Sequence, residues 1–169
     1  MKLTFFLALT FFSSVNPASV ASEPLVMPIS GASHLEVINE YESPLTEYGA
    51  GHRGIDLEAP IGTQVIAPVS GEISFSGQVG YRESITIRFG NSFRASLEPV
   101  CSELIEGTLV LAGEVIGTVC EPDISYQWHC EFACLHFGTR TVSGYFSPLA
   151  LLGVLAPSRL VPLGDQALG

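Results

Sequence analysis

Apolar and polar residues alternate along the middle of the chain, most clearly in the runs 73–76, 85–89 and 93–98. Alternation with period two is typical of β-strands that bury one face, and no stretch of useful length has helical periodicity. A glycine-containing link between the second and third runs predicts a tight hairpin. Because side chains two apart on a strand share a face, Ile73 and Phe75 are expected on the same side. The pattern predicts an all-β protein, an antiparallel sandwich.

The length of 169 residues and the apolar content of 47% suit one globular domain with a real core. Residues 1–21 resemble a secretory signal peptide, with a positive start at Lys2, an apolar run and a Ser-Val-Ala cleavage site. The run is too short for a permanent membrane span, although an uncleaved anchor is the alternative. We expect a secreted or cell-envelope protein with a lead-in segment 22–50, a core domain 51–153 and a tail 154–169.

The charge is strongly acidic, with seventeen Asp plus Glu against seven Lys plus Arg and a formal net charge of −10. Removal of residues 1–21 takes away Lys2 and no acid, so the charge becomes −10 − 1 = −11. Nucleic-acid binding depends on clustered Lys and Arg, so we expect no nucleic-acid partner. Tight adsorption to anionic wall polymers is disfavoured for the same reason.

Two short segments, 51–56 and 134–138, offer two imidazoles and one carboxylate to a single metal ion. The candidate ligands are His52, Asp56 and His136. Zinc binds neutral histidine nitrogen and carboxylate oxygen, and three protein ligands leave a fourth position open, as in catalytic sites. The sequence therefore predicts Zn²⁺ as the cofactor.

Four cysteines form an even set, which in an exported chain favours disulfides over free thiols. We favour Cys101 with Cys120, because they end two predicted strands, and Cys130 with Cys134. The second bridge would close the loop that leads into His136. A metal cluster built from Cys130, Cys134 and His136 is the competing interpretation.

These motifs resemble the lysostaphin/LytM-type zinc metallopeptidases, which cut peptide bonds in peptidoglycan and carry His-x-x-x-Asp followed by His-x-His. The resemblance extends over about residues 28–153. It implies a β-sandwich core with a duplicated, barrel-sandwich-like hybrid motif, and metal binding by the three ligands named above. The segments that carry it besides the ligands are Pro28–Gly31, Tyr48–Gly51, Ala59–Thr63, Ala67–Gly71, Gly113–Gly117 and Tyr145–Leu149.

Two positions depart from that family. Cys134 stands where the first histidine of His-x-His is expected, and Pro99 stands where a further histidine would follow a tyrosine strand. The resemblance implies that these histidines position the attacking water and stabilise the oxyanion. His129, next to the second cysteine pair, is the candidate replacement base. Arg53 and Arg140 flank the ligands and are candidates for binding a substrate carboxylate or the oxyanion, with structural ion pairing as the alternative.

Two functions are therefore expected from the sequence. The first is an exported zinc metalloendopeptidase acting on peptidoglycan peptides. The alternative is a catalytically degenerate LytM-like domain that binds cell wall or activates another wall hydrolase. A biotinyl- or lipoyl-type carrier is excluded, because such domains modify a lysine and Lys2 in the signal segment is the only lysine.

Overall fold

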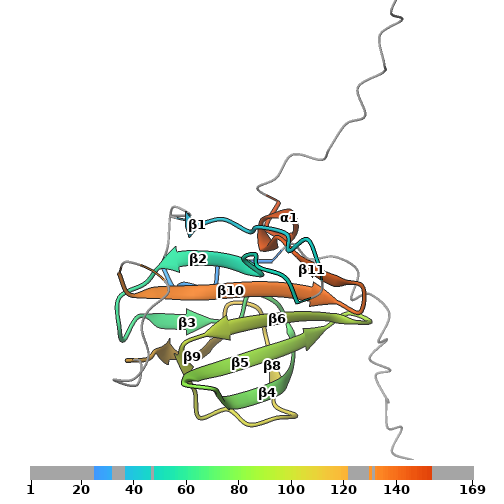
Figure 1. Ribbon diagram of the computed structural model, residues 1–169. Helices are drawn as coiled ribbons and strands as arrows, with labels where there is room; N and C mark the ends of the chain where they lie inside the picture. The colour runs from blue at the N-terminus through green and yellow to red at the C-terminus, as the bar shows by residue number, and fades with distance from the viewer. Residues whose placement is uncertain (1–24, 32–36, 47, 122–129, 131, 154–169) are drawn as a thin grey trace, which may run out of the picture.

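The computed structural model describes residues 25–31, 37–46, 48–121, 130 and 132–153. Its strands form two sheets, and every pair of neighbouring strands is antiparallel. The large sheet has the order β1 (Val37–Asn39), β2 (Gly54–Glu58), β10 (Cys134–Thr141), β6 (Phe93–Glu98), β5 (Arg82–Phe89), β4 (Gly71–Val79) and β8 (Leu109–Val110), with β11 (Gly144–Phe146) beside β10. The small sheet has the order β3 (Gln64–Ile66), β9 (Val115–Val119) and β7 (Val100–Cys101). Figure 1 shows β2, β10, β6, β5 and β4 in succession across the large sheet.

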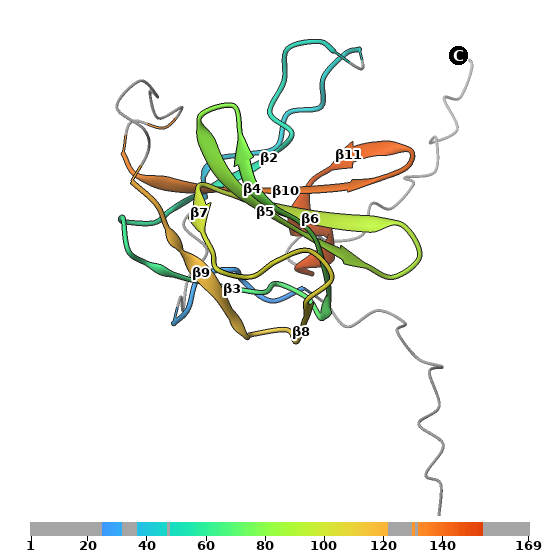
Figure 2. The ribbon, with the colours of Figure 1, turned by 90° about the horizontal axis from the view of Figure 1, so that it is seen from below.

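The core lies between the two sheets, as the alternating pattern predicts. Ile85, Ile87 and Leu97 from the large sheet are fully buried, as are Val65 and Val119 from the small sheet. Figure 2 shows the small sheet facing the large one across this space. Burial of such side chains contributes about 1.5–3 kcal/mol each. The all-β antiparallel prediction is confirmed.

The described parts of the predicted lead-in segment pack on the core domain. Leu25 is buried, and its amide donates to the carbonyl of Leu151 at 3.1 Å, in the one-turn helix α1 (Pro148–Leu151). Val37 of β1 pairs with Leu57 of β2, which adds the edge strand of the large sheet. None of the helices in the described parts of the chain is long or apolar enough to cross a membrane.

A β-bulge in β4 changes which side chains share a face. Ile73 pairs with Ile87, but Phe75 pairs with Thr86. The extra residue between them shifts the alternation by one position, because side chains alternate with period two. Ile73 is buried in the core, whereas Phe75 lines a groove on the other side of the sheet. The expectation that Ile73 and Phe75 share a face is therefore wrong.

The disulfides join the favoured pairs. Cys101 is bonded to Cys120, which links β7 to the end of β9 with 5.3 Å between the Cα atoms. Cys130 is bonded to Cys134 at the start of β10, with a Cα separation of 6.3 Å. The predicted signal peptide, His129 and the tail 154–169 lie outside the described residues.

Candidate metal centre and groove

Three donor atoms converge on one point beside β2 and β10. The distance from His52 Nε2 to Asp56 Oδ1 is 3.1 Å, from His136 Nδ1 to Asp56 Oδ1 2.8 Å, and from His52 Nε2 to His136 Nδ1 3.1 Å. Tetrahedral zinc with bonds of about 2.0–2.1 Å requires ligand atoms about 3.3 Å apart. The three donors, of the types that zinc prefers, already have nearly that spacing.

The strand register brings two of these ligands together. Asp56 of β2 lies directly opposite His136 of β10. Its neighbours Ile55 and Leu57 are buried in the core, so the intervening carboxylate points to the other face. The third ligand, His52, precedes β2 and is held by two backbone hydrogen bonds with Glu42, of 2.9 and 3.0 Å. The sequence-predicted ligands therefore meet at one site.

Outer partners leave the metal-facing atoms available. The Nδ1 of His52 lies 2.7 Å from the carbonyl oxygen of Glu40, which can only accept, so this nitrogen carries the proton and Nε2 offers its lone pair. Asn39 donates from Nδ2 to Oδ2 of Asp56 at 2.9 Å, which leaves Oδ1 toward the histidines. Both partners belong to the segment before the core domain. That segment thus completes the candidate metal centre.

Gly54 gives the ring of His136 its space. A Cβ at this position would lie 2.6 Å from Nε2 of His136 and would also meet the backbone oxygen of Phe137. Any larger residue would displace the ring or the strand pair. Glycine is required at position 54 because the His136 ring and the backbone of β10 approach it closely. The usual reason for a glycine, a sharp bend in the chain, does not apply here.

The second disulfide lies beside the metal centre. Cys134 of β10 lies opposite Glu58 of β2, two residues along the strands from the pair His136 and Asp56. The Sγ of Cys130 lies 3.9 Å from Nδ2 of Asn39. Both sulfurs are within 4.8 Å of an Asp56 oxygen. Because they are bonded to each other, they offer no thiolate to a metal. This arrangement differs from the Cys and His cluster that was the competing interpretation.

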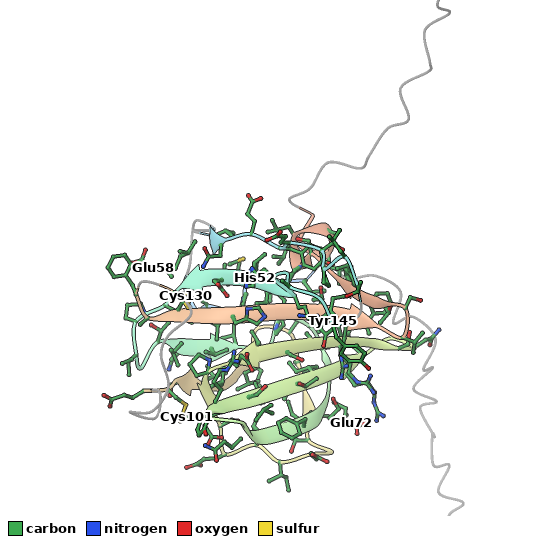
Figure 3. The ribbon with its side chains drawn as sticks, in the orientation of Figure 1. His52, Glu58, Glu72, Cys101, Cys130 and Tyr145 are labelled. Carbon is green, nitrogen blue, oxygen red and sulfur yellow. A yellow bond between two sulfur atoms is a disulfide. The ribbon has the colours of Figure 1, made fainter. Side chains whose placement is uncertain are left out.

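A groove of about 610 Å³ crosses the same face of the large sheet, next to the metal centre. His136 lines it beside the metal centre, and Tyr145 of β11, which pairs with Arg140 farther along β10, lines it too. Figure 3 shows His52 and Tyr145 over the large sheet, with Tyr145 displaced along β10 toward β11. The remaining lining residues are Arg53, Ser74, Phe75, Val79, Ser84, Thr86, Arg88, Arg94, Ser96, Glu98, Gly138 and Arg140.

Glu98 is a groove residue that sequence reasoning missed. It lies directly opposite His136 in the register of β6 and β10, and it accepts a hydrogen bond from Nη1 of Arg82 at 2.6 Å. Pro99, which stands where the family resemblance expects a histidine, is buried beyond the end of β6 and is not among the residues that line the groove. The alternation of Arg94, Ser96 and Glu98 in the sequence was the signal that could have identified it.

The two candidate substrate-binding arginines both line the groove. The guanidinium of Arg53 lies 5.7 Å from the ring centre of Tyr145, and that of Arg140 lies 5.9 Å from it. Arg53 also donates from Nη2 to the carbonyl of Gly49 at 3.1 Å. Both guanidinium groups thus lie within cation–π distance of one aromatic ring.

Comparison with known proteins gives a family match. The model of peptidase family M23 matches residues 50–148, more than half of the chain. Uncharacterised proteins of Mycobacterium tuberculosis (strain H37Rv) and Mycobacterium bovis are 31% identical over 134 residues, covering 77% of this chain and 52% of theirs. The chain thus spans about half the length of the curated relatives it matches.

Solved structures share the fold. The catalytic domain of the antimicrobial peptidase lysostaphin from Staphylococcus simulans has a TM-score of 0.59 at 24% identity, over 70% of this chain and 92% of that one. A zinc-containing peptidase from Vibrio cholerae has a TM-score of 0.61 at 16% identity, over 76% and 40%. A chain of the SpoIIQ–SpoIIIAH pore-forming complex has a TM-score of 0.63 at 17% identity, over 78% and 92%. Identities this low establish only the fold, and it is the match over residues 50–148 that shows the chain to belong to peptidase family M23.

Proposed function

We propose that this protein is an exported zinc metallopeptidase that hydrolyses peptide bonds in peptidoglycan. The observation that carries the proposal is the convergence of His52 Nε2, Asp56 Oδ1 and His136 Nδ1 at zinc-like spacing beside a groove. Zinc held there would polarise a peptide carbonyl and activate water near neutral pH. Peptides of the cell wall are the partners expected for the groove.

Glu98 is the acid–base group that the groove offers to this reaction. Glu98 lies opposite His136, and the Cβ atoms of facing residues are about 4.5–5.5 Å apart. Its carboxylate is therefore within reach of a water molecule bound at the metal centre. An Oε atom would accept the proton that water loses as the new C–O bond forms. The same oxygen would return that proton to the amine nitrogen as the C–N bond breaks. The hydrogen bond from Arg82 would hold the carboxylate in place.

Export is supported by the sequence start and by the cysteines. Residues 1–21 have the composition of a signal peptide. The disulfides Cys101–Cys120 and Cys130–Cys134 use all four cysteines, and such bonds persist in oxidising compartments. We therefore propose that the protein acts in the cell envelope or outside the cell.

Digestion of purified peptidoglycan by the mature, zinc-loaded protein tests the proposal. We expect new amino termini to be released, and we expect their release to stop in Asp56→Asn and to continue in Glu58→Gln. The second variant is a matched control, because it makes the same change at an exposed carboxylate on the same strand. Release by both variants at the wild-type rate would contradict the proposal.

A degenerate domain that binds cell wall or activates another wall hydrolase is the second candidate. The observation that favours it is the disulfide at Cys134, the position where the family resemblance expects a histidine that acts on the attacking water or the oxyanion. In that case the protein would bind zinc and peptidoglycan but release no amino termini by itself. Addition of a partner hydrolase would then reveal activation.

A further inference from the structure

The arginines of this acidic protein are gathered in the groove. The chain contains six arginines, and four of them line it: Arg53, Arg88, Arg94 and Arg140. The only carboxylate among the lining residues is Glu98. A chain of net charge −10 thus presents a cationic groove. This concentration of charge contrasts with the uniformly acidic surface that composition alone suggests.

Three of these arginines form a row across adjacent strands, which we name the arginine row: Arg88, Arg94 and Arg140. Arg88 of β5 lies directly opposite Arg94 of β6, and Arg94 lies directly opposite Arg140 of β10. Like charges that face each other across strands destabilise a sheet. Placing these charges opposite one another is therefore expected to cost stability, which points to a use of the row other than stability.

The row has little compensation from acidic side chains. Arg88 is paired with Glu72, whose carboxylate oxygens both lie 2.9 Å from its Nη2. Among the described residues, Arg94 and Arg140 have no ion-pair partner, and Arg140 lies over the ring of Tyr145. Two guanidinium groups are therefore available to a carboxylate, which arginine binds through two parallel hydrogen bonds.

The arginine row lies at a fixed distance from the metal centre. Arg140 follows His136 by four residues on β10, and Arg94 precedes Glu98 by four on β6. Even spacing keeps them on one face, and a rise of 3.2–3.4 Å per residue separates the two ends by about 13 Å. An extended peptide lying along the groove covers that distance in about four residues.

Small residues form the floor between the two ends. Gly138 of β10 pairs with Ser96 of β6, and Ser96 pairs with Thr86 of β5. The hydroxyls of Ser96 and Thr86 are hydrogen-bonded to each other at 2.9 Å. At this level of β10, β6 and β5, between the metal centre and the arginine row, the three paired residues all have small side chains or none. A peptide backbone has room to pass.

We propose that the arginine row binds a carboxylate of the peptide substrate about four residues from the bond that is cut, so that acidic peptides are the preferred substrate class. The inference rests on the proposed peptidase function for the meaning of the metal end. A carboxylate on a short peptide fits better than a long polyanion. The row is a single compact cationic site, and the rest of this acidic chain would repel a continuous run of phosphates.

Binding of capped alanine hexapeptides to the metal-free protein tests the proposal separately from catalysis. Each peptide carries one glutamate at one of its six positions, or glutamine at the same position. We expect at least one glutamate peptide to bind tenfold or more tightly than its glutamine match, and this preference to vanish in Arg94→Gln/Arg140→Gln. Arg159→Gln, which removes one positive charge outside the described residues, should keep it.

Three results would overturn the inference. Equal binding of every glutamate and glutamine pair would do so, and so would a preference that survives in the double variant. Tighter binding of a single-stranded oligonucleotide than of any glutamate peptide, lost in the double variant, would identify a phosphate site instead. If glutamate peptides bind selectively while zinc-loaded protein releases no amino termini from peptidoglycan, the arginine row stands and the peptidase function fails.

Discussion

The two ends of the groove lie on the same strands, β10 and β6, but are built in opposite ways. At the metal end, His52 and Asp56 have polar partners of suitable hydrogen-bonding capacity, Glu40 O and Asn39, and Arg82 donates to the neighbouring Glu98. At the other end, the arginine row sets like charges opposite one another. The first end is preorganised for a cation. The second is preorganised for an anion and is expected to cost stability when empty.

Loss of the buried Asp56 carboxylate should have the largest effect of the changes considered, and it should lower zinc affinity. In Asp56→Asn the metal centre keeps its shape but loses its only anionic ligand, so zinc affinity should fall by well over the ~100-fold typical of lost outer partners. Competition with a fluorescent chelator measures this. The Glu58→Gln control should bind zinc like the wild type, and zinc retention by Asp56→Asn would contradict the assigned ligands.

Glu98→Gln should separate chemistry from metal binding. If this carboxylate moves the proton, turnover should fall by about 10²–10⁴-fold while zinc content stays at the wild-type value. Elemental analysis and peptidoglycan digestion on the same samples provide both values. Glu106→Gln, at an exposed acid in a turn, is the matched control. Unchanged turnover in Glu98→Gln would exclude this residue from the reaction.

Asn39→Ala should have an intermediate effect. It removes the donor to Asp56 Oδ2 and leaves all three ligands in place. Loss of an outer partner typically lowers metal affinity by about 10–100-fold. Asn91→Ala in the exposed turn after β5 serves as the control. Wild-type zinc affinity in Asn39→Ala would show that the lead-in segment does not tune the centre.

Arg94→Gln should have the smallest effect, and it should be a gain in stability, whereas the changes above are losses of zinc affinity or turnover. Removal of the central charge of the arginine row should raise the free energy of unfolding by about 0.2–1 kcal/mol, because like charges no longer face each other. Urea denaturation measures the difference. Arg82→Gln, which breaks an ion pair with Glu98, should instead lower or barely change stability. A loss of stability in Arg94→Gln would contradict the claim that the facing arginines of the row destabilise the sheet.

The metal end could be predicted from sequence because its chemistry follows from short motifs. His52, Asp56 and His136 occur at spacings that strand geometry turns into one cluster. The arginine row could not be recognised in the same way. Its members come from three strands whose pairing register the sequence leaves open, and only that register sets Arg88, Arg94 and Arg140 side by side.

Local irregularity limited the rest of the prediction. The bulge in β4 moved Phe75 from the expected core face to the groove, and a bulge leaves no clear signal in an alternating run. Pro99, where the family resemblance expects a histidine, is buried, whereas the side chain of its neighbour Glu98 lines the groove on the other face of the strand. His129 stays a prediction, because it lies outside the described residues.

X-ray absorption spectroscopy at the zinc edge of the purified, oxidised protein tests the central claim most directly. The account predicts one zinc per chain with nitrogen and oxygen ligands at about 2.0–2.2 Å, and two imidazole signatures from His52 and His136. Sulfur at about 2.3 Å would place the metal on Cys130 or Cys134 and contradict the assigned centre. So would a protein that takes up no zinc at all.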